Sequence, residues 1–119
     1  MNDIIKAIDI LAKTEKSRAA AIYGAHHSRH EAFAILREEY DEMTDDENRV
    51  LVDMDKIWDG IKKNATQEEL ADPIKSLIID AILMAAEAVQ VVATAYRLQE
   101  FDAGFITDWE EIKKGIKNI

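Results

Sequence analysis

The chain has 119 residues, of which 48% are apolar and 33% are charged. This is the length of one domain, and the apolar fraction excludes a disordered chain. Twenty-four acidic residues against fifteen basic ones give a formal net charge of −9, which would repel a polyanion, so we expect no nucleic-acid binding. The absence of cysteine excludes disulfides and thiolate metal sites.

The composition favours helices. One proline and four glycines allow few sharp turns, whereas residues with high helix propensity are plentiful. We therefore predict an all-α fold, in which residues 1–119 form a single domain built as a bundle of four to five helices.

The first helix is predicted from about residue 3 to residue 23, where apolar residues recur at helical spacing. Gly24 is its expected C-terminal stop. Charged residues interrupt the apolar ones, so this segment is an amphipathic helix and not a signal peptide. The second helix follows Ser28, and the helical pattern continues to about Lys63, with Asn64 as a left-handed cap.

Four capping boxes support these helix starts, because in each a hydroxyl residue is followed three positions later by glutamate. The boxes are Ser28 with Glu31, Thr44 with Glu47, Thr66 with Glu69 and Thr107 with Glu110. Thr44 either begins a new helix or bends the one before it.

Thr66 opens a short turn that Pro73 is expected to limit, because Asp72-Pro73 suits an N-cap followed by proline at the first helical position. A long helix is predicted from Pro73 to about residue 101. Gly104 then breaks the pattern, and a short closing helix is expected from Thr107 to about residue 117.

The long helix is apolar on almost all sides between Leu77 and Val92. Such a helix is normally buried, and a chain of this size cannot bury it alone. We therefore expect a homodimer or homotetramer with this helix near the contact. A membrane span would not usually hold two carboxylates facing lipid, so Asp80 and Glu87 argue against a membrane and for a cytoplasmic protein.

Acidic side chains gather on the second helix, where Glu38, Glu39 and Glu42 flank the edge of its apolar stripe. Like charges at this spacing destabilise a helix unless a cation neutralises them. Magnesium prefers carboxylate and water oxygens, so these residues are candidate ligands. The alternative is a solvated acidic face.

A second group lies on the long helix, where Asp80, Glu87, Gln90 and Thr94 form one narrow polar stripe. A buried carboxylate must meet a cation, a hydrogen-bond donor or solvent. One interpretation is a salt-bridge network with basic partners, for which Arg37, His30, Arg97 and Lys75 are available. The other is a carboxylate cleft shared with the second helix.

Three histidines precede or begin the second helix, namely His26, His27 and His30. Zinc binding was one interpretation, but the His26/His30 pair straddles the helix cap and no Glu-x-x-His arrangement supports it. Capping and packing roles fit this position better.

Two stretches together resemble the MazG-like all-α nucleotide pyrophosphohydrolases, including small phage and prophage relatives. The first is the run from His30 to Glu42, with Glu38-Glu39-x-x-Glu42, and the second runs from Ala86 to Ala95. The resemblance implies hydrolysis of (deoxy)nucleoside triphosphates to the monophosphate and pyrophosphate by a dimer or tetramer whose carboxylates hold magnesium.

The second family motif is Glu-x-x-Asp, and here the chain departs from it. Either Glu87 takes the aspartate position and Met84 the glutamate position, or Glu87 takes the glutamate position and Gln90 the aspartate position. The resemblance implies Glu38 and Glu39 as catalytic residues. Carried over by match, Glu38, Glu39 and Glu42 form the first group of magnesium ligands, Glu87 is a ligand on the long helix, and Asp80 lies further along the same stripe as an additional ligand. Lys62, Lys63, Arg37 or Arg97 are available to hold phosphates, and the sequence does not choose among them. The alternative function is a non-catalytic helical interaction or regulatory protein of phage or prophage origin.

Overall fold

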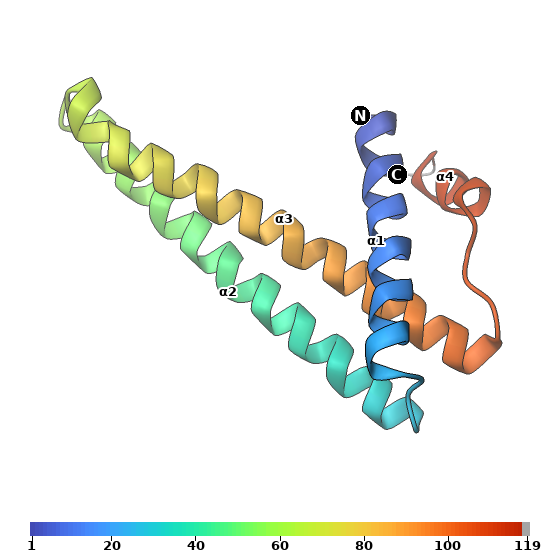
Figure 1. The fold of residues 1–119 in the computed structure, drawn as a ribbon. Coiled ribbons are helices and arrows are strands. Elements are labelled where there is room, and N and C mark those ends of the chain that lie inside the picture. The colour runs from blue at the N-terminus through green and yellow to red at the C-terminus, as the bar shows by residue number, and fades with distance from the viewer. Residues whose placement is uncertain (118–119) are drawn as a thin grey trace. The chain divides into compact units, whose positions relative to one another are not determined.

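The computed structural model of the chain describes residues 1–117. Its helices are α1 (Asn2–Tyr23), α2 (Arg29–Lys62), α3 (Gln67–Ala103) and α4 (Trp109–Lys117), labelled in Figure 1. The described residues contain no strand, so the predicted all-α fold is confirmed. The chain divides into two compact units, one of residues 1–39 and 89–119 and the other of residues 40–88.

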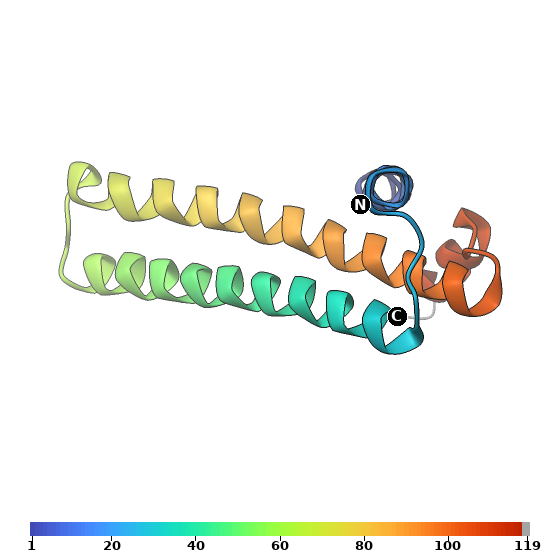
Figure 2. The same cartoon turned by 60° about the horizontal axis from the view of Figure 1, so that its bottom comes forward.

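The second unit is a helical hairpin, in which the C-terminal part of α2 and the N-terminal part of α3 run antiparallel and side by side (Figures 1 and 2). Asn64 turns the chain between them with a φ of 58°, which confirms the predicted left-handed cap. The capping box at Thr66 forms as predicted. Glu69 N–H donates to Thr66 Oγ1 at 3.1 Å, and Thr66 N–H donates to Glu69 Oε1 at 3.3 Å.

The first unit is held together where α1 meets the C-terminal part of α3. Ala12 and Ala93 are exposed by only 0% and 2%, and they form a small core with Tyr96. The Tyr96 hydroxyl donates to the buried carboxylate of Asp9, which also accepts from Lys13 Nζ at 2.8 Å. This polar contact satisfies two groups that would otherwise be costly to bury.

The predicted ends of α1 and start of α2 are confirmed. Gly24 has a φ of 75°, and its N–H donates to the Ala20 carbonyl at 2.9 Å. Glu31 N–H donates to Ser28 Oγ at 3.1 Å, which is the expected N-cap bond.

Two other predicted caps were wrong. At Thr44 the helix continues, and the hydroxyl donates to the Tyr40 carbonyl one turn back at 3.0 Å instead of capping a new start. The closing helix begins one residue later than expected, because the Asp108 carboxylate accepts from Glu111 N–H at 3.0 Å. Thr107 instead pairs with the Gln99 side chain.

The prediction of a fresh helix start at Asp72-Pro73 was also wrong, because Pro73 lies inside α3. The helix already begins at Gln67, where the Thr66 box satisfies its first free N–H groups. Pro73 removes one backbone hydrogen bond, and the remaining bonds of a 37-residue helix retain the helical path.

Apolar side chains are widely exposed on both long helices. Ile78 and Ile82 on α3 are 55% and 63% exposed, and Trp58 on α2 is 57% exposed. Within the described residues α3 is the one helix long and apolar enough to cross a membrane, judged by length and composition only, and 11% of its most apolar window is buried. A core helix of a water-soluble protein meets the same criterion.

Candidate functional site

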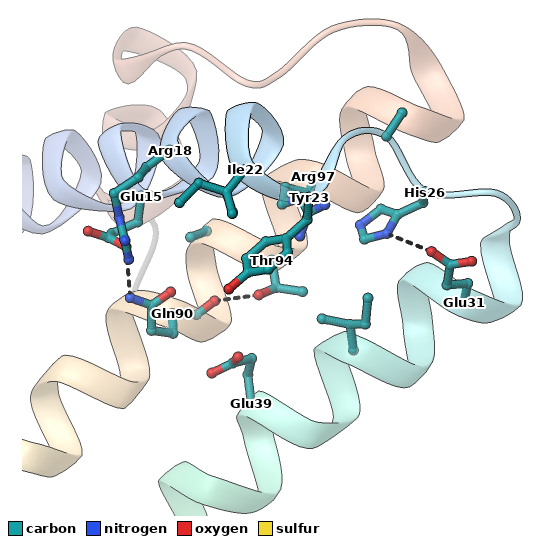
Figure 3. A pocket seen from close by; sticks show the side chains of 14 residues that line it. Glu15, Arg18, Ile22, Tyr23, His26, Glu31, Glu39, Gln90, Thr94 and Arg97 are labelled. Carbon is teal, nitrogen blue, oxygen red and sulfur yellow. Dashed lines mark hydrogen bonds and ion pairs between the residues drawn. The ribbon is translucent and has the colours of Figure 1, made fainter.

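A cavity of about 460 Å³ lies in the first unit, between α1, the first turns of α2 and the C-terminal part of α3 (Figure 3). Its polar lining comes from all three helices and from the loop after α1. Its charged and polar side chains include Glu15, Arg18, His26, Glu39, Gln90 and Arg97. A cavity of this size with convergent polar groups is typical of a small-molecule site.

A hydrogen-bonded group forms one wall of the cavity. The Glu15 carboxylate accepts from Arg18 at 2.7 Å and from Gln90 Nε2 at 3.1 Å. These two donors, the arginine more than the amide, hold the pKa of Glu15 below its usual value. Thr94 donates to the Gln90 backbone carbonyl at 2.8 Å (Figure 3). The wall therefore presents an ionised carboxylate and an oriented amide.

His26 occupies the opposite end of the cavity and is only 6% exposed. Its Nδ1 lies 3.8 Å from Glu31 Oε1, and its ring meets Phe101 edge to face with centroids 6.4 Å apart. Its Nε2 is buried and has no hydrogen-bond partner among residues 1–117. Burial, followed by the nearby Arg97 cation, lowers the pKa of His26, so the ring is neutral at pH 7.

The lowered pKa of His26 makes the stability of the chain depend on pH. The unfolded histidine takes up a proton near pH 6.5, whereas the folded one does so only at lower pH, so stability falls as the pH drops below about 6.5. We expect the Tm of the wild-type protein to decrease between pH 7.5 and pH 5.5, and the decrease to be smaller in His26→Gln. The exposed His27 gives the matched control, since His27→Gln should retain the wild-type slope. Equal slopes in all three proteins would contradict this role of burial.

The other two histidines, His27 and His30, are exposed. Among the described residues no histidine belongs to a group of three or more metal-ligating side chains. The packing role predicted for this segment fits the buried His26.

The two predicted catalytic glutamates occupy different environments. Glu39 is half-buried and rises from α2 into the cavity (Figure 3). Glu38 is exposed and is not among the residues that line the cavity. Of the pair, Glu39 is therefore the one that lines a cavity.

Two predicted metal ligands come together in the second unit. Glu42 from α2 and Glu87 from α3 each offer a carboxylate oxygen, and these oxygens lie within 4.8 Å of each other. Glu39 precedes Glu42 by three residues on the continuous helix α2, one helical turn away on the same side. Residues 45 positions apart in the sequence are thus joined by the hairpin.

The fourth predicted ligand, Asp80, is placed elsewhere. It lies two turns before Glu87 on α3, where Ser76 Oγ approaches its carboxylate at 3.4 Å and Arg49 Nε at 3.9 Å. It also faces Asp53, which the sequence interpretation missed. The spacing of Asp53 with Val50 and Ile57 on the apolar stripe of α2 could have indicated a buried carboxylate.

The basic residues predicted to contact phosphate are divided between the two units. Arg97 lines the cavity, and one guanidinium nitrogen donates to the Gly24 carbonyl at 3.1 Å. Lys62 lies in the second unit and pairs with Asp59 at 3.2 Å, and Lys63 is exposed. Arg97 and the unpredicted Arg18 are the guanidinium groups at the cavity wall.

No protein-family model matches the chain, and no curated protein or solved structure matches it either.

Proposed function

We propose that the chain is a magnesium-dependent nucleotide pyrophosphohydrolase of the MazG-like type, which hydrolyses (deoxy)nucleoside triphosphates to the monophosphate and pyrophosphate. The observation that carries the proposal is the approach of Glu42 and Glu87 from two antiparallel helices to within 4.8 Å. Two carboxylates this close repel each other unless a cation or a proton neutralises them. Their oxygens are the ligands that magnesium prefers, so the donor set fits that ion.

In this proposal Glu42 and Glu87 hold magnesium. Glu39, one turn earlier on α2, acts on the attacking water molecule. Magnesium would supply positive charge to neutralise the phosphate oxygens as charge develops in the transition state. Glu39 is suited to orient a water molecule and to accept its proton, because it faces the cavity and not bulk solvent. The exposed Glu38 is the weaker candidate for that role.

The cavity in the first unit has the size and the polar lining of a nucleoside site. Its volume of about 460 Å³ lies within the range of about 300–1,000 Å³ found for small-molecule sites. The Glu15 carboxylate can accept hydrogen bonds from a base amino group, and the Gln90 amide can both donate and accept. Arg18 and Arg97 supply cationic groups that can pair with phosphate oxygens.

The direct test is to incubate the purified chain with each ribo- and deoxyribonucleoside triphosphate, with and without Mg²⁺, and to measure pyrophosphate separately from phosphate. We expect pyrophosphate and the monophosphate in equal amounts, only when Mg²⁺ is present. Chelation should stop turnover, and restored Mg²⁺ should recover it. The absence of pyrophosphate at high protein concentration, together with a Tm that Mg²⁺ does not raise, would eliminate this function.

We further propose that the working form is a homodimer or homotetramer. The apolar side chains exposed on the second unit come from both of its helices. They include Leu51, Val52, Met54, Trp58, Ile61, Ile74, Ile78, Ile79, Ile82 and Leu83. A two-helix hairpin cannot bury such faces by itself, and a second hairpin of the same kind can complete a four-helix arrangement.

The same exposed faces support a second candidate, a non-catalytic helical interaction or regulatory protein of phage or prophage origin. In that case Glu39, Glu42 and Glu87 would bind no cation, and their carboxylates would repel one another. Glu39→Gln and Glu42→Gln would then leave stability unchanged or raise it, and any effect of Mg²⁺ on the Tm would be the same in both variants as in the wild type.

A further inference from the structure

A second pair of carboxylates, Asp53 and Asp80, lies nearer to the turn of the hairpin than Glu42 and Glu87 do. Asp53 on α2 is only 5% exposed. One of its oxygens accepts from Ser76 Oγ at 2.9 Å, whereas Oδ2 is buried and has no hydrogen-bond partner among the described residues. A buried carboxylate oxygen without a partner carries a large desolvation cost, so it calls for a proton or a cation.

The group facing Asp53 is a second carboxylate and so cannot donate to it when ionised. Asp80 on α3 has a side chain exposed by 15%, and Ser76 Oγ lies 3.4 Å from its Oδ2. The hydrogen-bond contact with Asp53, then burial, then repulsion from the same carboxylate raise the pKa of Asp80. The neighbouring Arg49 is paired with the buried Asp46, and it approaches Asp80 no closer than 3.9 Å.

A cavity of about 360 Å³ opens beside this group and is lined by Asp53, Ser76 and Asp80 together with Arg49 and Lys56. The cavity therefore gives an ion a path from solvent to the edge of this carboxylate pair. Magnesium and manganese typically take one or two carboxylates and keep several water ligands, so a set of two carboxylates and one hydroxyl is sufficient. A divalent cation in this cavity would neutralise both carboxylates and supply the partner that Asp53 Oδ2 lacks.

We propose that Asp53, Ser76 and Asp80 form a second divalent-cation site, which links the two helices of the hairpin. The site is separate from the Glu42/Glu87 pair. Asp80 precedes Glu87 by seven residues, which is about 10 Å along α3, and Asp53 follows Glu42 by eleven residues, about 16 Å along α2. Its occupation stabilises the hairpin and does not depend on the proposed nucleotide chemistry.

The test isolates this site in a Glu42→Gln/Glu87→Gln background, which removes the other carboxylate pair. Mn²⁺ is titrated into the protein, and free Mn²⁺ is followed by its electron paramagnetic resonance signal. We expect one Mn²⁺ per chain, displaced by Mg²⁺, with affinity at least tenfold weaker after Asp53→Asn. Asp55→Asn, an exposed carboxylate two residues further along α2, is the matched control and should bind as the background does.

Two further variants make the result decisive. Asp80→Asn should weaken Mn²⁺ binding to the same degree, and it decides the matter if Asp53→Asn does not fold by circular dichroism. Lys56→Gln should leave binding equal or tighter, because it removes a competing cation from the cavity. The proposal is overturned if the background binds no Mn²⁺, if neither aspartate variant weakens binding, or if Mn²⁺ binds only after Lys56→Gln. The last outcome would show that the lysine ammonium occupies the site.

Discussion

Replacing Glu39 by glutamine is expected to reduce kcat/KM for pyrophosphate release by about 100-fold or more, because a positioned general base contributes roughly 10²–10⁴-fold to a rate. The amide keeps the size of the side chain but cannot accept a proton from water.

Glu42→Gln should act differently, since it removes a magnesium ligand next to Glu87. We expect Glu42→Gln to reduce the Mg²⁺-dependent rise in Tm, measured by differential scanning fluorimetry, to the part that the Asp53/Asp80 site contributes.

Glu47→Gln provides the matched control, because it makes the same chemical change at an exposed position of α2. Its kcat/KM and its Mg²⁺ response should equal those of the wild type. Glu38→Gln tests the other predicted catalytic residue, and its exposure leads us to expect a loss of less than tenfold. A Glu38 variant that is more impaired than the Glu39 variant would reverse the assignment of the water-orienting carboxylate.

Introducing a charge on the apolar face of α3 is expected to weaken self-association on the order of 100-fold, because an unpaired charge would have to be desolvated in the contact. Ile82 is 63% exposed in the single chain, so Ile82→Lys adds no buried charge there. The wild-type protein should have at least twice the mass of one chain by light scattering after size exclusion. The variant should shift toward the monomer and lose helical circular dichroism on dilution.

Gln67→Lys adds the same charge at an exposed position in the first turn of α3, and it should leave the wild-type mass unchanged. A wild-type chain that remains a folded monomer at all concentrations would refute homo-oligomerisation. Recovery of the wild-type chain in the membrane fraction would refute it too, and would show that lipid covers α3.

Local backbone chemistry made several helix boundaries predictable. Gly24 and Asn64 both adopt positive φ, a conformation that most other residues avoid, so their effect does not depend on distant contacts. A new helix start at Thr44, which was one of two alternatives, and the start predicted at Pro73 are both absent, because a capping residue or a proline expresses only a local preference. An established helix can absorb one missing hydrogen bond when the flanking turns are already formed.

The candidate site was predictable in part for a similar reason. Helical spacing identified the faces that carry Glu42 and Glu87, and the hairpin joins them. The spacing could not give the register of the hairpin, because register depends on the length and conformation of the turn around Asn64. As a result Asp80 was assigned to the same cluster, whereas the observed register places it against Asp53.

The alanine contact between α1 and α3 has a consequence for which ligands the chain can admit. Ala93 belongs both to the core with Ala12 and to the lining of the cavity, so the spacing of the two helices there also sets the width of the cavity. A closely packed core resists added methylene groups by shifting its helices. Under the proposed function, a larger residue at Ala12, which does not line the cavity, would therefore change the preference for small or large nucleobases without touching a bound molecule.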